Sequence, residues 1–298
     1  MITPKRLQKG DTVAIVSTAR KISREELKPA LQLLESWDLK AILGKTIGAE
    51  ESQFAGSDAL RAADFQHMMN DQGVKAIWCA RGGYGTVRII DKLDFSTFKK
   101  APKWIIGYSD VTVLHSHIHN FGIETLHAQM CLEIENKTPE TASSLKSILF
   151  GTNHSITYNS TEKKNAEVVI SGEIIGGNLS VLYSLIGSTS EMKTDGKILF
   201  IEDLDEMLYH IDRMMVNLKR SGYLKNLKAL IIGGMTQMKD NKVSFGKTAE
   251  EIIIDLVKEY NYPVILNFPA GHIVDNRALI MGRKIEINVH SSTINVQF

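Results

Sequence analysis

Cysteine is scarce in this chain of 298 residues, and long apolar runs are missing. The two cysteines, Cys79 and Cys131, form no CxxC or other paired spacing, which argues against a disulfide framework and favours a reducing, cytosolic location. No run approaches the roughly 18 apolar residues of a membrane span. The apolar stretch 13–16 follows a Gly-Asp turn and is too short for the core of a signal peptide.

An excess of charge of either sign is also lacking. Lys and Arg total 35, and Asp and Glu total 34. This balance points to neither nucleic acid nor an anionic membrane as a partner. What the chain does have is the composition of a folded globular protein, with 43% hydrophobic and 23% charged residues. Its length suits one large domain or two ordinary ones.

Short apolar runs alternate with helical periodicity through the first half of the chain. An amphipathic helix is expected after Ser23 and Glu26, which form a capping box, and Pro29 predicts that this helix kinks or starts late. Buried strands are expected at 12–17, 40–43, 74–79 and 103–106, with helices at 58–69, from 86 to 90, and at 111–120. This rhythm predicts an α/β fold with a parallel, doubly wound sheet, whose ligand sites lie beyond the carboxyl ends of the strands.

The pattern changes between about 133 and 165, where the sequence is polar and rich in turn-forming residues. We interpret 1–132 as an N-terminal domain, 133–170 as a connection and 171–298 as a C-terminal domain. In the last of these, strands are expected at 197–201, 227–232 and 263–266, and helices at 179–185, 206–219 and 247–260. The tail alternates like short antiparallel strands at 278–282, 284–289 and 293–297.

Ser109 lies where the fourth expected strand turns into a helix, within the motif GYSD. A serine at such a sharp turn stands clear of the sheet edge, and a nearby glycine permits a tight approach, as in a nucleophile elbow. Val111 occupies the place of the usual second glycine. The pattern is equally typical of a serine or aspartate that only caps the helix.

A second glycine-rich turn, ARGGYG, follows the third expected strand. Such loops expose backbone N–H groups that suit an anion or a developing oxyanion. We therefore place the amides of Gly83 and Asp110 around an oxyanion. A dinucleotide site fits less well, because GGYG lacks the full GxGxxG spacing and no acidic residue stands out at the end of the following strand.

A serine nucleophile requires a histidine that takes its proton, and the histidine requires an orienting carboxylate. Of the nine histidines, His272 follows the strand expected at 263–266, in a loop opened by proline and glycine. Glu202 and Asp203 end another strand, at the same kind of sheet edge, and the pattern does not choose between them. The chain order of serine, acid and histidine matches that of α/β-hydrolases.

Six ordered blocks, spread over nearly the whole chain, resemble the LD-carboxypeptidase family, which includes the microcin-immunity peptidases. They are ARGGYG, GYSDVTVLH, GEIIGGNLSVLYSLIGS, LFIEDLDE, HIDRMMVNLKRSG and GHIVDNRALIMG. The resemblance implies a flavodoxin-like N-terminal domain and a smaller, mixed α/β C-terminal domain with antiparallel strands. It also implies an active site in the cleft between the two domains.

The resemblance further implies roles for single residues. Ser109 matches the family's nucleophile, Glu202 its acid and His272 its base, while Gly83 and Asp110 match the amides of its oxyanion hole. Members commonly release the terminal D-alanine of cytosolic murein tetrapeptide by cleaving an LD peptide bond, in peptidoglycan recycling, and need no metal or organic cofactor. Homodimers are common among similar proteins, although this sequence identifies no interface.

One block departs from the family pattern. Members often have His-Gly-Pro where this chain has His127-Ala128-Gln129. This block lies outside the expected triad but near the expected cleft, so the substrate is less well determined than the chemistry. Two alternatives remain: a microcin-type immunity peptidase that cleaves a peptidyl or aminoacyl nucleotide, and a non-catalytic two-domain protein that binds a peptide.

Several other residues admit both a chemical and a structural role. His115 and His119 share a helical face and suit zinc, but no glutamate lies between them as in HExxH and no third ligand is evident, which favours packing or polar contacts. Cys79 has apolar neighbours and is expected in the core rather than as a nucleophile. Arg81 either holds the carboxylate of a substrate or braces its own loop. His127 either reaches the cleft or packs in the core.

Overall fold

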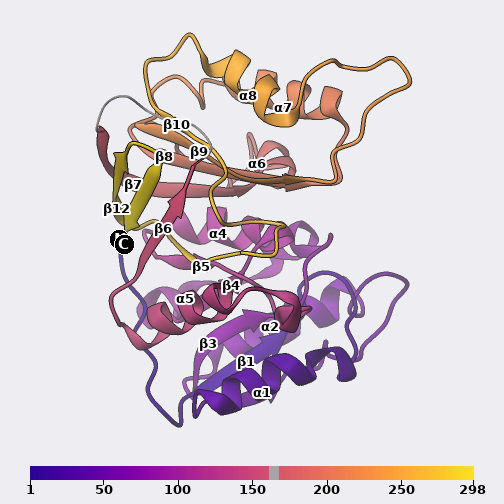
Figure 1. Ribbon diagram of the computed structural model, residues 1–298. Coiled ribbons are helices and arrows are strands. Elements are labelled where there is room, and N and C mark those ends of the chain that lie inside the picture. Colours follow the sequence, from indigo (N-terminus) through magenta and orange to yellow (C-terminus); the bar gives the residue numbers. More distant parts are fainter. Residues whose placement is uncertain (161–167) are drawn as a thin grey trace.

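The computed structural model describes residues 1–160 and 168–298, which form two β-sheets stacked one above the other with helices on their faces (Figure 1). This arrangement confirms the predicted two-part α/β fold. No helix in these two ranges has the length and apolar character that crossing a membrane requires.

The first sheet is parallel except at one edge. Its order is β11-β5-β4-β3-β1-β2, built from β1 (Thr12–Val16), β2 (Lys40–Leu43), β3 (Val74–Cys79), β4 (Trp104–Gly107), β5 (Thr125–His127) and the antiparallel β11 (Leu279–Met281). The five parallel strands have the flavodoxin-like order 2-1-3-4-5, as the family resemblance implies. In such a sheet the chain reverses its direction of winding between β1 and β3, which leaves a crevice at their carboxyl ends.

Helices cover both faces of the first sheet. They are α1 (Lys28–Ser36), α2 (Asp58–Asn70), α3 (Ser96–Lys100), α4 (Thr112–His119) and α5 (Pro139–Phe150). The predicted capping box is present, with the Ser23 amide donating to Glu26 at 2.8 Å, but it begins the short 3-10 turn Glu25–Leu27. The α-helix itself starts later and takes Pro29 in its first turn, where proline removes no intrahelical hydrogen bond.

The prediction of a helix from 86 to 90 is wrong. The chain there forms two 3-10 turns, Thr86–Arg88 and Ile90–Lys92. The Thr86 amide donates to the Asp110 carboxylate at 2.8 Å, and its hydroxyl pairs with that of Thr18 at 2.8 Å. These partners come from distant segments, so the helical periodicity of this short stretch could not reveal that its backbone is held by side-chain contacts.

The second sheet is mixed, as the resemblance implies. Its order is β10-β9-β8-β7-β12-β13-β6, built from β6 (Ser155–Asn159), β7 (Val168–Asn178), β8 (Ile198–Leu204), β9 (Ala229–Thr236), β10 (Val264–Ile265), β12 (Lys284–His290) and β13 (Thr293–Gln297). The long strand β7 pairs antiparallel with β12 in its first half and parallel with β8 in its second. Three helices pack against this sheet through an apolar cluster: α6 (Leu179–Ser184), α7 (Leu208–Arg220) and α8 (Ala249–Val257).

The segment expected to be a connection contains regular structure. Helix α5 packs on the first sheet, and strand β6 pairs with β13 at the edge of the second. Residues 161–167 of this segment lie outside the described residues. Conversely, strand β11, which belongs to the C-terminal part of the chain, pairs with β5 in the first sheet. The proposed domain limits at 132 and 170 therefore remain a prediction.

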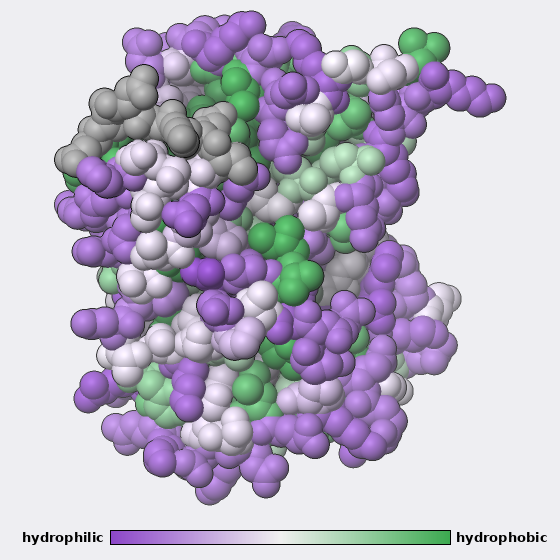
Figure 2. Space-filling view, in the orientation of Figure 1, coloured by the Kyte–Doolittle hydropathy of each residue, from purple (hydrophilic) through white to green (hydrophobic). Residues whose placement is uncertain are grey.

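Helix α4 lies between the two sheets and joins them (Figure 1). At its start, the Thr112 hydroxyl accepts the Asn178 amide at 3.0 Å. At its end, His119 bonds to Glu173, which also forms an ion pair with Lys197 at 2.6 Å. Figure 2 shows a mostly hydrophilic surface in the same orientation, with its outline indented on the right between the two halves. Helix α4 thus contacts a strand of each sheet, β5 in the first and β7 in the second.

Candidate active site

A cleft of about 400 Å³ opens at the carboxyl ends of strands from both sheets. This is the edge at which parallel sheets collect their ligand sites. From the first sheet it receives the loops after β1, β3, β4 and β5, and from the second the loops after β7 and β8 and the loop that holds His272. Its lining residues include Arg20, Arg81, Gly83, Ser109, Asn178 and His272.

Ser109 lies directly after β4 with a positive φ of 62°. For a residue with a side chain this left-handed conformation is uncommon, and it is the strained turn on which a nucleophile elbow depends. Gly107 makes the turn possible, because a Cβ atom there would lie 2.8 Å from the side chain of Val111. The sharp turn of the chain exposes the Ser109 side chain in the cleft, where the sequence predicted it.

The glycine-rich loop after β3 packs directly against Ser109. A Cβ atom on Gly82 would lie 3.3 Å from the Ser109 hydroxyl oxygen, so a larger residue there would crowd that oxygen. Gly83 also lines the cleft, has φ +110°, and is covered by Arg20, whose Cδ would lie 2.5 Å from a Cβ there. The Asp110 carboxylate is buried and accepts the Thr86 amide, while its own amide belongs to the first turn after Ser109. First-turn amides have no acceptor within their helix, so this one is free to serve a ligand.

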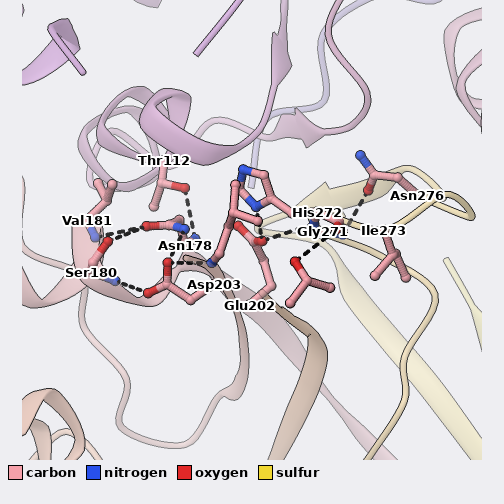
Figure 3. Close-up of polar contacts among 12 residues, drawn as sticks. Thr112, Asn178, Ser180, Val181, Glu202, Asp203, Gly271, His272, Ile273 and Asn276 are labelled. Atoms are coloured by element: carbon pink, nitrogen blue, oxygen red, sulfur yellow. Dashed lines mark hydrogen bonds and ion pairs between the residues drawn. The ribbon is translucent and has the colours of Figure 1, made fainter. Parts of the chain in front are cut away.

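His272 is paired with the buried Glu202, and Figure 3 shows the two side chains in contact. Glu202 Oε2 accepts the ring Nδ1 of His272 at 2.6 Å and the His272 backbone amide at 3.2 Å. The Glu202 side chain is completely buried, whereas the ring of His272 lines the cleft. The carboxylate thus fixes both the tautomer and the direction of the imidazole, with Nε2 as the nitrogen left for a substrate or nucleophile.

The electrostatics of this pair favour charge separation. Burial alone would raise the pKa of Glu202, but the charge and hydrogen bond of His272 outweigh burial and hold the pKa below its ordinary value. For His272 burial lowers the pKa, and the charge and hydrogen bond of Glu202 outweigh it, so the pKa lies above its ordinary value. A histidine of this kind is a stronger base than a free imidazole.

Asp203, which the local pattern alone did not separate from Glu202, turns away from His272. Its carboxylate accepts the side-chain amide of Asn178 at 2.9 Å and the backbone amide of Ser180 at 2.9 Å (Figure 3). Burial and the neighbouring charge of Glu202 raise the pKa of Asp203 to about 7. Asp203 therefore holds the start of α6 in place, and Glu202 is the acid in contact with the histidine.

Ser109 and His272 line the same cleft, but the described residues include no hydrogen bond between the Ser109 hydroxyl and the His272 ring. The ring of His272 instead lies against Tyr108, with 4.8 Å between ring centroids. Hydrogen bonds between catalytic groups are often long or poorly aligned without substrate and tighten when it binds. The arrangement offers a hydroxyl, an oriented base with its carboxylate, and backbone donors in one cleft, which is what acyl transfer requires.

The remaining chemical candidates have structural partners. His115 is hydrogen-bonded to Thr125 and to the Gly107 carbonyl, and His119 is hydrogen-bonded to Glu173. Both rings therefore have structural hydrogen-bond partners. Cys79 is completely buried, and burial, together with the charge of Asp110, raises the pKa of its thiol to about 12. Such a thiol is a poor nucleophile. Arg81 lines the cleft and donates to the Lys21 carbonyl at 3.1 Å, which leaves its remaining N–H groups for a ligand.

Sequence patterns did not identify Arg20, Tyr108 or Asn178 as site residues, although all three line the cleft. Arg20 had one usable signal, since it follows β1 by four residues and so lies beside the crevice between β1 and β3. Asn178 had a signal of a different kind: it ends β7 and caps helix α6, where its side chain accepts a hydrogen bond from the Val181 amide. Tyr108 packs on both His272 and His127, a contact that depends on long-range packing alone.

Gly271→Ala is expected to destabilise the protein and to displace the Glu202 carboxylate. Gly271 has φ +106°, and a Cβ atom there would lie 2.8 Å from both Cβ and Oε2 of Glu202. Gly246→Ala is a matched control, because its φ of +78° carries similar backbone strain while nothing lies within 4 Å of the new methyl group. Thermal unfolding should show an additional loss of about 1–3 kcal/mol for Gly271→Ala over the control. Equal losses in both variants would mean that the glycine does not shape the pair.

Comparison with known proteins identifies both halves of the chain. Residues 13–128 match the model of the LD-carboxypeptidase N-terminal domain, and residues 171–287 match that of the LD-carboxypeptidase C-terminal domain. A probable murein peptide carboxypeptidase of Bacillus subtilis is 36% identical, over 99% of this chain and 94% of that protein.

Solved structures share the whole fold. The muramoyltetrapeptide carboxypeptidase of Oxalobacter formigenes superposes with a TM-score of 0.87 at 26% identity, over 96% of this chain and 98% of that one. The microcin C7 self-immunity protein MccF, in complex with aspartyl sulfamoyl adenosine, superposes with a TM-score of 0.88 at 23% identity, over 100% of this chain and 99% of that one. At that identity the second similarity concerns the fold alone.

Proposed function

The chain belongs to the LD-carboxypeptidase family, and we propose that it is a serine carboxypeptidase that releases the terminal D-alanine of murein tetrapeptide. The bond cleaved joins the L-centre of the penultimate residue to that D-alanine. The proposal places the enzyme in peptidoglycan recycling in the cytoplasm, as a homodimer, and needs no metal or organic cofactor.

One observation carries the proposal: a strained serine and an acid-bound histidine face the same cleft. Ser109 has φ +62° at the end of a parallel strand, and His272 is bound through Nδ1 to the buried Glu202 at 2.6 Å. Strained backbone at a cleft and a histidine and carboxylate that shift each other's pKa are both typical of active sites. The family membership supports the same assignment, because these three residues match the family's nucleophile, acid and base.

In the first step, His272 Nε2 takes the proton of the Ser109 hydroxyl, and the oxygen attacks the carbonyl carbon of the penultimate residue. Glu202 holds the imidazole tautomer and stabilises the imidazolium that forms. The amides of Gly83 and Asp110 stabilise the negative oxygen of the tetrahedral intermediate. A donor of this type contributes roughly 3 kcal/mol to lowering the barrier.

In the second step, the intermediate collapses and the amine of D-alanine leaves with the proton from His272. The shortened peptide is then an ester of Ser109. A water molecule gives a proton to His272 as it attacks this ester, and the same amides stabilise the second oxyanion. Cleavage of the ester returns the proton to Ser109, so that the enzyme is unchanged after one turnover.

The substrate is proposed to bind through its terminal carboxylate. Arg81 and Arg20 both line the cleft on the side of the glycine-rich loop. A guanidinium group matches a carboxylate with paired hydrogen bonds, which suits a carboxypeptidase because only the last residue of a peptide offers that group. The names of the relatives favour a murein peptide as the substrate of this chain. The structural similarity to MccF keeps an aminoacyl nucleotide as the second candidate.

Release of D-alanine from purified murein tetrapeptide tests the proposal. The wild-type protein is expected to release D-alanine from the tetrapeptide, to leave the tripeptide and a diastereomer ending in L-alanine intact, and to be insensitive to EDTA and to thiol reagents. Aspartyl sulfamoyl adenosine is the parallel substrate. Cleavage of that compound alone would replace the proposal with the immunity-type reaction. Binding of tetrapeptide without any cleavage by folded protein would instead indicate a non-catalytic peptide-binding protein.

A further inference from the structure

Three buried polar atoms without a hydrogen-bond partner belong to Glu202 of the His272–Glu202 pair and to the neighbouring His127. They are Nδ1 and Nε2 of His127 and Oε1 of Glu202, and all three lie in the described part of the chain. Buried polar groups in folded proteins are nearly always hydrogen-bonded, because an unsatisfied group loses its contacts with water and gains nothing in return. Finding three such atoms in two residues calls for a common explanation.

The two side chains point into the same region. The His127 ring lies 5.0 Å from the ring of Phe200 and 5.8 Å from that of Tyr108, between ring centroids. Phe200 and Glu202 are two residues apart on β8, so their side chains emerge on the same face of the sheet. Tyr108 in turn contacts the ring of His272 at 4.8 Å. His127 is completely buried among these side chains, close enough to Glu202 for the charge of the carboxylate to act on its ring.

His127 is suited to donate a hydrogen bond. Burial lowers the pKa of His127 to about 4, even though the charge of Glu202 acts in the opposite direction. The ring is therefore neutral near pH 7, with one N–H donor and one acceptor nitrogen. The nearby His115, also neutral and buried, shows the ordinary solution, since both of its nitrogens have partners in Thr125 and Gly107. His127 has no such partners, so its role lies elsewhere.

A second polar side chain lies near Glu202. Asn178 is close enough to help lower the pKa of Glu202, but its side-chain amide donates to Asp203 at 2.9 Å. Its carbonyl oxygen accepts from Ser180 and Val181 at 2.9 and 3.1 Å. The second N–H of the Asn178 amide also acts on Glu202 and helps to lower its pKa, but among the described residues no hydrogen bond of normal geometry joins it to Oε1. The ring of His127 is the other donor near this carboxylate.

We propose that His127 is a positioning residue, whose ring donates through one buried water molecule to Glu202 Oε1 and so holds Oε2 against His272. A water that bridges two buried polar groups satisfies both at little entropic cost. With Oε1 held, the carboxylate cannot rotate away from the imidazole, and Oε2 stays free for His272 alone. This inference rests on the proposed catalytic role of the pair, since His127 acts only through it.

Kinetics of His127→Phe and His127→Gln test the proposal in the complete protein. Phenylalanine replaces the imidazole by a ring without nitrogens. We expect kcat to fall about 10- to 100-fold, which is typical when a residue that orients a functional side chain is replaced, and KM to stay unchanged. Glutamine keeps an N–H donor and should recover most of the loss. In the Glu202→Gln background His127→Phe should have no further effect. His154→Phe, at a half-buried ring bonded to the Ala278 carbonyl, is the control and should leave kcat unchanged.

Crystal structures of wild type and His127→Phe give a readout that needs no substrate, and so separates this inference from the proposed function. In the wild type we expect a water within hydrogen-bond distance of both His127 and Glu202 Oε1, and in the variant a rotated or doubly placed carboxylate. The proposal is overturned if Asn178 occupies Oε1, if the Glu202 carboxylate is unchanged in the variant, or if phenylalanine and glutamine lower kcat equally.

Discussion

Ser109→Ala is expected to lower kcat for D-alanine release by about 10⁴- to 10⁶-fold, a loss typical of removing the nucleophile of a catalytic triad. The reason is that the variant has no oxygen that can form the ester with the substrate. KM should change little, because the cleft walls and both arginines remain. Measurement of D-alanine release at saturating tetrapeptide gives kcat directly, and circular dichroism shows whether the variant is folded.

Combining this change with His272→Ala distinguishes a triad from two independent residues. Once the serine is gone the histidine has no proton to take, so the double variant should be about as slow as either single one. Ser184→Ala is the control, because Ser184 is an exposed serine whose hydroxyl donates to the Val181 carbonyl of its own helix. Losses that multiply in the double variant would show that Ser109 and His272 do not act together.

Glu202→Gln is expected to lower kcat by about 10⁴-fold, as replacing a triad carboxylate by its amide does elsewhere. The amide can donate its own N–H to Nδ1 of His272, which places the ring proton on Nε2 and leaves no free base for the serine. Asp203→Asn is the matched control on the neighbouring residue, whose carboxylate contacts Asn178 and Ser180 instead of the histidine. A larger loss of kcat in Asp203→Asn than in Glu202→Gln would mean that Asp203, and not Glu202, is the carboxylate that orients His272.

The same variant should change the pH dependence in a defined direction. The neutral form of His272 is the base, so wild-type activity rises with pH through a pKa that Glu202 holds above the ordinary value of 6.5. Without the carboxylate charge, burial lowers that pKa, and the rise should occur at lower pH. Asp203, with a pKa of about 7, titrates in the same range, so the profile of Asp203→Asn separates its effect.

Stability should follow the pair as well. Because the pKa of His272 is raised in the folded protein, protonated His272 stabilises the fold. This contribution to the free energy of unfolding is complete below pH 6.5 and is lost as the pH rises through the pKa of the folded protein. Because the pKa of Glu202 is lowered in the folded protein, its contribution to the free energy of unfolding is complete above pH 4.5 and is lost as the pH falls through the pKa of the folded protein. The difference in unfolding temperature between wild type and Glu202→Gln should therefore be largest between these values.

Most strands and the fold class could be predicted, because apolar runs of four to eight residues report local burial. The late start of α1 also followed from one residue, Pro29. The predictions failed where the partner of a segment is distant. Helix α5 and strand β6 were taken for a polar connection, since each buries only one face, and the turn at Thr86 is held by Asp110. Short strand β5 has three residues and too little pattern to be recognised.

The candidate site divided in the same way. Ser109, Gly83 and His272 were identified from turns that follow strands, and the family resemblance supplied their roles. The structure places all three in one cleft. Arg20 escaped notice because its one signal, a position four residues after β1, is weak, and it comes to the cleft through the packing of β1 beside β3. The unsatisfied nitrogens of His127 are invisible in any sequence pattern.

The sequence by itself determined most of the strands and helices and which edge of the sheet carries chemistry, because these depend on residues adjacent in the chain. The local pattern left Glu202 and Asp203 open, the family resemblance pointed to Glu202, and the tertiary structure shows Glu202 in contact with His272. Neighbouring residues of a strand point to opposite faces, and β8 shifts its register against β9 between Ile201 and Asp203. Which face meets the histidine is set by where the loop of Gly271 packs, 70 residues away in the chain. That contact is long-range, and no local pattern encodes it.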